Sequence, residues 1–109
     1  MEIQGFAIDV INELVRIEQN LRFINDDVKG VANLKSRSDS LRAIFESRGY
    51  EIPELLGKES IQTSNMEVSF ERDENLPKGA NIIRRVIRPE ISLNGKMIQA
   101  AMVVVAFNE

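Results

Sequence analysis

The sequence of 109 residues contains no cysteine, no histidine and no tryptophan. Without thiols or imidazoles, the chain cannot form disulfides, build a Cys/His zinc site or use thiol or imidazole catalysis. Only 6% of the residues are aromatic, although 43% are hydrophobic. We therefore expect an aliphatic core and exclude most of the common enzyme classes.

The sequence also lacks an excess of basic residues and a long apolar run. Its 14 Lys and Arg residues face 17 Asp and Glu residues, which gives a net charge of -3. A dedicated nucleic-acid-binding protein would carry a basic excess. The first ten residues show no signal-peptide pattern, and no apolar run approaches the roughly 18 residues that span a bilayer. We expect a soluble, cytosolic protein that binds neither nucleic acid nor membrane.

Familiar catalytic motifs are missing as well. The sequence has no P-loop, no dinucleotide-binding glycine pattern, no nucleophile elbow and no EF-hand loop. Two pairs of adjacent carboxylates, Asp26-Asp27 and Asp73-Glu74, have no partner base or nucleophile near them in sequence. Adjacent acids in loops usually cap helices or lie in solvated turns. The sequence predicts no catalytic residue, no metal site and no cofactor, and therefore a protein that is not an enzyme.

The first part of the chain has the apolar periodicity of an amphipathic helix. Its apolar residues are spaced alternately by four and three positions, as on the seam of a coiled coil. A second row, formed by Phe6, Ile11 and Val15, widens this face, so the helix should contact more than one neighbour. The residues of the seam are Ile3, Ala7, Val10, Leu14, Ile17, Leu21 and Ile24.

A second helix is expected after the acidic corner Asn25-Asp26-Asp27, whose side chains can cap its first turn. Gly49 stands where a left-handed residue would end this helix. Its expected core row consists of Val31, Leu34, Leu41 and Phe45, interrupted by Ser38. Residues 1–49 should thus form a helical hairpin.

The seam of this hairpin can be covered in two ways. It could lie in the internal core of one chain, or it could form the interface of a homodimer. We favour the homodimer, because a single hairpin offers nothing else to cover that face. Two hairpins that bury their seams together form a four-helix bundle.

Residues 50–109 change to the pattern of a small, mainly antiparallel β-domain, and the fold class is therefore α+β. Met66, Val68 and Phe70 alternate with polar residues, which indicates a half-buried strand. A second strand over 82–88 alternates poorly, which suggests a bulge.

The end of the chain predicts a hairpin followed by a covered strand. Asn94-Gly95 is the dipeptide that best accepts the positive φ angles of a type I′ turn. The last strand, residues 102–107, is apolar enough to be central in a sheet or covered on both faces.

Arg84, Arg85 and Arg88 form the only dense basic cluster of the sequence. In a regular strand, Arg84 and Arg88 would share one face and Arg85 would point to the other. Three interpretations remain open. The cluster could belong to a solvated sheet face with Glu67 and Glu71, it could bind an acidic protein, or it could bind a single-stranded nucleic acid, although few aromatic residues are present for base stacking.

The segment Ser92–Ala106, SLNGKMIQAAMVVVA, strongly resembles the closing hairpin of the GrpE family, which are nucleotide exchange factors of DnaK-type chaperones. Leu76–Gly79 is similar to the proline-glycine turn of the family, and Val86–Pro89 resembles the segment before its hairpin. Leu14–Leu21 is similar to a leucine-rich helical motif of the family, and Gly49 stands at its glycine corner between helix and sheet.

The resemblance implies a homodimer in which paired helical hairpins carry two β-domains. Each β-domain would bind the ATPase domain of a DnaK-type chaperone and promote ADP release. Asn94 could instead serve mainly to form the turn, and Met97 could be a core residue. The residues implied in partner binding lie on the terminal hairpin and its neighbours: Met66, Arg85, Arg88, Asn94, Lys96, Met97 and Gln99.

The chain departs from the family pattern at several positions. Gln99 replaces an arginine that contacts the chaperone, and Glu90-Ile91 replaces a glycine-aromatic pair. Residues 60–66 differ from the family signature before the first strand. We expect these changes to alter recognition rather than fold. Two other functions remain open: a dimeric adaptor for another acidic protein, and a small hydrolase in which Asp73 or Glu74 meets a second acid.

Overall fold

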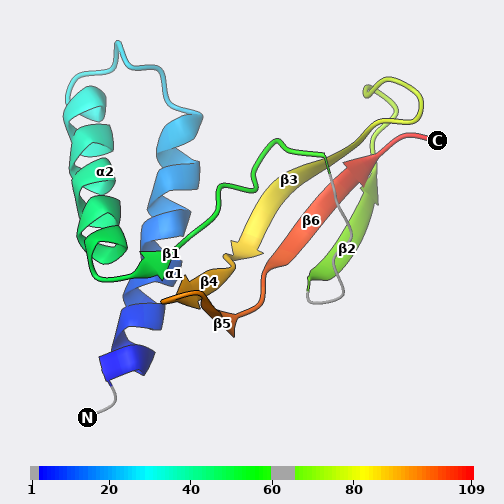
Figure 1. The fold of residues 1–109 in the computed structure, drawn as a ribbon. Helices are drawn as coiled ribbons and strands as arrows, with labels where there is room; N and C mark the ends of the chain where they lie inside the picture. Colours follow the sequence, from blue (N-terminus) through cyan, green and yellow to red (C-terminus); the bar gives the residue numbers. More distant parts are fainter. Residues whose placement is uncertain (1–2, 60–65) are drawn as a thin grey trace. The chain divides into compact units, whose positions relative to one another are not determined.

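A computed structural model describes residues 3–59 and 66–109 of the chain (Figure 1). The chain divides into two compact units. The helical unit comprises Met1–Glu51 together with Leu93–Gly95, and the sheet unit comprises Ile52–Ser92 and Lys96–Glu109. No helix in the described part is long and apolar enough to cross a membrane.

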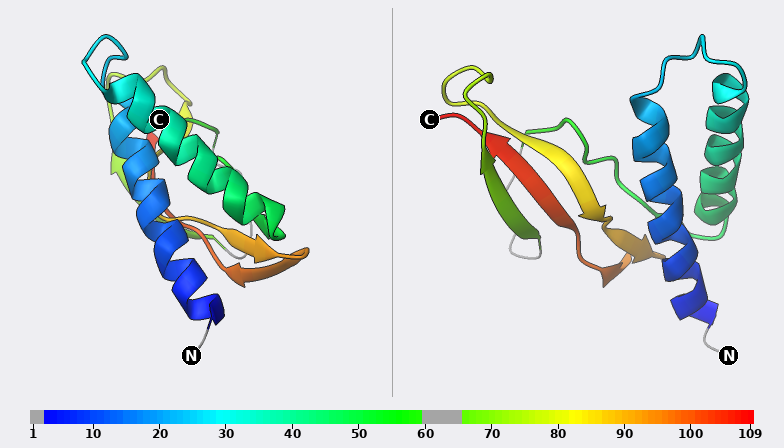
Figure 2. Two further views of the ribbon diagram at one scale, coloured as in Figure 1. Left: turned by 90° about the vertical axis from the view of Figure 1, so that its left-hand side faces the viewer. Right: turned by 180° about the vertical axis from the view of Figure 1, so that it is seen from behind.

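Helices α1 (Ile3–Arg22) and α2 (Val31–Ser47) run antiparallel, side by side, as the two views of Figure 2 show. The predicted helical hairpin is thus confirmed. The half-buried Arg42 of α2 donates two hydrogen bonds, of 2.8 and 2.9 Å, to the carboxylate of Glu18 on α1. This bidentate ion pair sets the register of the two antiparallel helices, that is, which residues of α1 and α2 lie at the same height.

The start of α2 differs from the prediction. The helix begins after Gly30, which has a φ angle of +87° and provides no side-chain cap. The Asn25 side chain instead accepts a hydrogen bond from the N–H of Asp27, and Asp26 forms an ion pair with Lys35. The acidic corner therefore forms a turn of its own, and the prediction that its side chains cap α2 is wrong.

The end of α2 agrees with the prediction. Gly49 follows the helix with a φ angle of +92°, a left-handed conformation that favours glycine. The Phe45 ring packs edge-on against Tyr50, with 5.8 Å between ring centroids. Within the helical unit, the N–H of Asn94 donates a 2.9 Å hydrogen bond to the carbonyl of Gly49.

Two three-stranded sheets follow the helices. Strands β1 (Tyr50–Glu51), β4 (Ile91–Leu93) and β5 (Lys96–Gln99) form one sheet in the order β1-β4-β5. Strands β2 (Glu67–Arg72), β6 (Met102–Phe107) and β3 (Asn81–Arg88) form the other in the order β2-β6-β3. The α+β class is confirmed.

The pairing around β6 is partly as expected. Strand β3 pairs antiparallel with β6, and its register shifts twice, between Ile83 and Arg85 and between Val86 and Arg88. The predicted irregularity of this strand is confirmed. Strand β2, however, pairs with β6 in parallel. A parallel pair needs a long connection, and strands β3, β4 and β5 lie in the segment between β2 and β6.

The core of the sheet unit lies along β6. Val103, Val105 and Ala106 are completely buried, as expected for a central strand. Ile83 and Val86 of β3 are also buried beside them. Among the described residues, Tyr50 is the only aromatic residue in the buried core, so the expected aliphatic core is confirmed.

Candidate partner-binding surfaces

The terminal hairpin has the predicted turn. Asn94 and Gly95 have φ angles of +52° and +85°, as a type I′ turn requires, and Asn94 is exposed. The Asn94 side chain also lies against the backbone of Gly49: a Cβ atom added to Gly49 would overlap the Asn94 Oδ1 and lie 3.2 Å from Cγ. Asn94 therefore forms the turn and contacts the end of α2 at once.

Strand β5 leads away from this turn with two exposed side chains. Lys96 is exposed, and Met97 is 37% exposed, so Met97 is not a core residue. Gln99 is half-buried, and its Nε2 donates a 2.8 Å hydrogen bond to the carbonyl of Pro89. Of the three, Lys96 and Met97 offer the more accessible atoms to a partner.

The remaining candidates lie on the other sheet. Arg88 and Glu67 occupy register positions on either side of Met102, so Arg88 and the neighbouring Met66 lie at the same end of this sheet. Both side chains are half-buried, and the buried Nε of Arg88 has no hydrogen-bond partner among the described residues. Arg85 is exposed and lies opposite Val104, nearer the middle of the strand.

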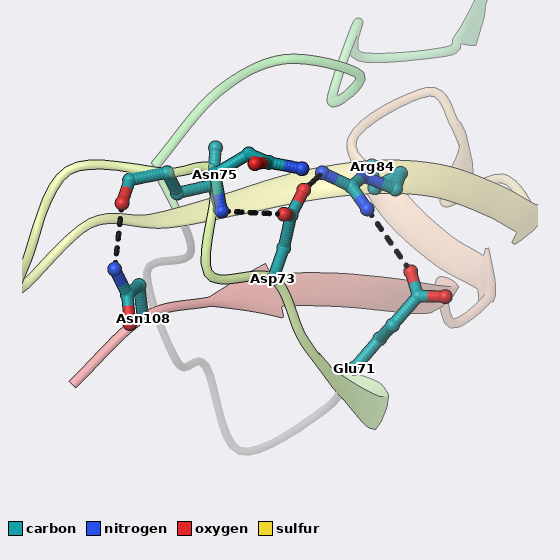
Figure 3. A network of polar contacts seen from close by, with 6 residues as sticks. Glu71, Asp73, Asn75, Arg84 and Asn108 are labelled. Atoms are coloured by element: carbon teal, nitrogen blue, oxygen red, sulfur yellow. Dashed lines mark hydrogen bonds and ion pairs between the residues drawn. The ribbon is translucent and has the colours of Figure 1, made fainter.

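Arg84 belongs to a different group of residues (Figure 3). Its guanidinium lies between two carboxylates, pairing with Glu71 at 3.4 Å and with Asp73. The N–H of Asn75 donates a 2.9 Å hydrogen bond to the second oxygen of Asp73. Hydrogen bonding from Arg84, and then from the Asn75 N–H, lowers the pKa of Asp73, and the same pairing raises the pKa of Arg84.

This network bears on two predictions: the interpretation of the basic cluster, and the alternative of a hydrolase that uses Asp73. The pairing of Arg84 with Glu71 agrees with the interpretation of a solvated, charge-paired sheet face. A carboxyl whose pKa is lowered stays ionised near neutral pH and is a poor general acid. In the described part of the chain, moreover, no three acidic side chains are grouped so that they could hold a metal ion.

The seam of α1 is divided between buried and exposed positions. Every second member of the seam is buried in the chain: Ala7, Leu14 and Leu21. The alternate members are exposed or half-buried: Ile3 is 75%, Ile17 49% and Ile24 39% exposed, and Val10 is half-buried. The hairpin thus covers one half of the seam and leaves the other half open.

Helix α2 has a similar open row. Leu34, expected in the core, is 55% exposed, and Leu41 and Phe45 are half-buried, whereas Val31 and Ser38 are buried. Leu34 was predicted to be a core residue but is exposed, because α2 faces α1 along a row formed by Val31, Ser38 and Arg42. Leu34 lies beside this row. The sequence pattern did not reveal this, because serine interrupts the row that is buried.

The two open rows lie on the same side of the hairpin. An α-helix turns by about 100° per residue, so a residue three positions further along lies about 60° back around the helix axis. Ile17 has this offset from the inward-facing Leu14 on α1, and Leu34 has the same offset from the inward-facing Val31 on α2. Because the two helices run in opposite directions, the same angular offset places both rows on one broad face. We call this the open apolar face; it consists of Val10, Ile17, Leu34 and Leu41, together with Ile24, which lies two residues beyond the end of α1.

No protein-family model matches the chain, and the search of curated proteins found no significant match. Segment 60–65, which departs from the GrpE-family signature, lies outside the described residues.

Proposed function

We propose that this protein is a GrpE-type nucleotide exchange factor: a homodimer that binds the ATPase domain of a DnaK-type chaperone and promotes ADP release. The observation that carries the proposal is the terminal hairpin. The segment that resembles the GrpE family in sequence forms a type I′ hairpin, and Lys96 and Met97 are exposed on it. The order of elements, a helical hairpin followed by small sheets, agrees with the fold that the resemblance implies.

The mechanism needs binding alone. A docked β-domain that prefers the open nucleotide cleft of the ATPase domain shifts that domain toward its open state by its differential affinity. To make a state populated at about 1% the majority state, the preference must exceed about 2.7 kcal/mol. A modest docked surface with a few well-buried anchor residues can supply this amount.

The open apolar face supports the dimeric part of the proposal. Soluble monomers seldom leave a continuous row of large apolar side chains in water. Ile17, in the second half of α1, and Leu34, in the first turn of α2, are each about half exposed, at 49% and 55%. A second hairpin laid on this face would complete a four-helix bundle.

The exchange function is tested by ADP release from a purified DnaK-type chaperone loaded with a fluorescent ADP analogue. Micromolar amounts of the chain should accelerate release, and Met97→Asp together with Lys96→Glu should abolish the acceleration. Lys78→Glu, which alters an exposed lysine on a different turn, is the matched control and should keep it. Failure of the unmodified chain to accelerate release, with several DnaK-type chaperones, would contradict the proposal.

A dimeric adaptor is the second candidate, and one observation favours it. Where the family has an arginine, this chain has Gln99, whose amide already donates to the carbonyl of Pro89. An amide cannot supply the charge of a guanidinium. A chain that is dimeric in sedimentation experiments but does not accelerate ADP release would support the adaptor.

A further inference from the structure

The open apolar face is bordered by charges of opposite sign on its two helices. On α1, beyond the apolar row and away from α2, lie the exposed Asp9 and Glu13, one helical turn apart. Arg16 lies further round and pairs with Glu13 at 2.6 Å, which leaves the border with a net negative charge. The corresponding border of the second helix carries Arg37 of α2 and Arg48, the C-cap residue that directly follows α2, and both are exposed.

Two symmetric arrangements can cover this face with a second copy of the chain. If the twofold axis runs parallel to the helices, α1 of each copy lies over α2 of the other, and an acidic border meets a basic one. If the axis runs perpendicular to the helices, α1 lies over α1 and α2 over α2. Borders of like charge then meet, which disfavours this arrangement.

The ion pair within the hairpin shows which charges would meet in the first arrangement. A twofold axis parallel to the helices preserves height, so the level of Glu18 and Arg42 applies across the interface too. With a rise of about 1.5 Å per residue, Arg48 lies about 9 Å beyond Arg42. On α1, Glu13 and Asp9 lie about 7.5 and 13.5 Å from Glu18 in the same direction. The level of Arg48 falls between theirs.

We infer that two copies pack with α1 of each against α2 of the other, and that Arg48 of each chain inserts between Asp9 and Glu13 of its partner. This inference rests on the dimer of the proposed function and specifies its geometry. Two carboxylates one turn apart can share the donors of a single guanidinium. Because the interface is symmetric, the contact occurs twice in each dimer.

The test is a charge exchange in the full chain, read as the dimer dissociation constant in sedimentation equilibrium. Arg48→Glu should weaken the dimer by about tenfold or more, because two repulsive contacts replace two attractive ones. The variant Asp9→Lys/Glu13→Lys should weaken it similarly. Combining all three substitutions should return the dissociation constant to within about threefold of the original. Far-UV circular dichroism verifies that each variant keeps its helices.

Arg37→Glu is the matched control, because it makes the same charge change on the same border. Arg37 lies about 7.5 Å from Arg42 in the opposite direction, at the level of the uncharged Phe23, so it should change the dissociation constant much less than Arg48→Glu. A dimer that is unaffected by Arg48→Glu, or not restored by the combined variant, would refute this arrangement but leave the dimer intact. An unmodified chain that stays monomeric at all concentrations would refute the dimer itself.

Discussion

Gly49 provides the sharpest test of the local structure, because an alanine there meets two obstacles. Its φ angle of +92° is unfavourable for a residue with a side chain, at a cost of about 1–2 kcal/mol. Its Cβ would also overlap the Asn94 side chain. The overlapping Oδ1 is the far end of an exposed side chain, so rotating that side chain away costs about 0.5–1.5 kcal/mol. We therefore expect Gly49→Ala to lower the free energy of unfolding by about 1.5–3.5 kcal/mol.

Gly30 supplies a matched control for this substitution. Its φ angle of +87° is nearly the same, but a Cβ atom there would meet nothing within 4 Å. Gly30→Ala should therefore lose only the backbone contribution, about 1–2 kcal/mol. Both substitutions restrict the unfolded chain equally, so that effect cancels in the comparison. The difference between the two variants isolates the contact with Asn94.

The assay is urea denaturation followed by circular dichroism, at one fixed protein concentration because dimerisation would add to apparent stability. Asn94→Gly should cost little by itself, since glycine also accepts the positive φ angle of the turn. In the Gly49→Ala/Asn94→Gly double variant, the loss should fall to about that of Gly30→Ala. Equal losses for Gly49→Ala and Gly30→Ala, or no recovery in the double variant, would refute the contact.

Three further predictions follow from other contacts. Because the pKa of Asp73 is lowered in the folded state, its pairing with Arg84 stabilises the fold above the unfolded pKa of about 3.9, and this contribution is lost as pH falls through the folded pKa. Asp73→Asn should therefore make the free energy of unfolding, measured by urea denaturation, fall less steeply between pH 7 and acid pH. An unchanged slope would contradict the pairing. Gln99→Arg should strengthen binding to a DnaK-type chaperone in a titration by calorimetry, whereas an unchanged affinity would show that position 99 does not dock. Glu18→Ala should lower the free energy of unfolding by about 1–3 kcal/mol, because it removes two charge-assisted hydrogen bonds from Arg42. A loss no larger than that of Glu46→Ala, at an exposed position of α2, would contradict this role.

The elements that the sequence predicted well are those whose local chemistry decides the backbone. Asn94-Gly95 and Gly49 take positive φ angles because few other residues accept them. The final strand is central because an unbroken apolar run needs cover on both faces. The irregularity of β3 was visible in the paired apolar and basic residues over 82–88. In each case a short segment contains all the information.

The elements that it predicted less well depend on residues outside the local segment, in other helices, strands or turns. Asp26 could cap α2 by its type, but it pairs instead with Lys35, and the helix starts four residues after the acidic corner ends. The parallel pairing of β2 with β6 is set by how the chain returns across the sheet, which the pattern within β2 does not encode. The pairing of Arg84 with Asp73 likewise joins two strands and a turn.

The α1 seam shows why sequence could locate a surface but not its occupant. A heptad seam on one helix predicts that its apolar residues will be covered, but it does not indicate whether an element of the same chain or a second chain covers them. The hairpin buries Leu14 and its equivalents seven residues away, while Ile17 and its equivalents stay open. Of the additional apolar row of α1, Ile11 and Val15 are buried as well and Phe6 is 65% exposed, so the open half belongs to the seam itself. The buried half of the seam belongs to the internal core, and the open half is the surface at which the dimer is proposed.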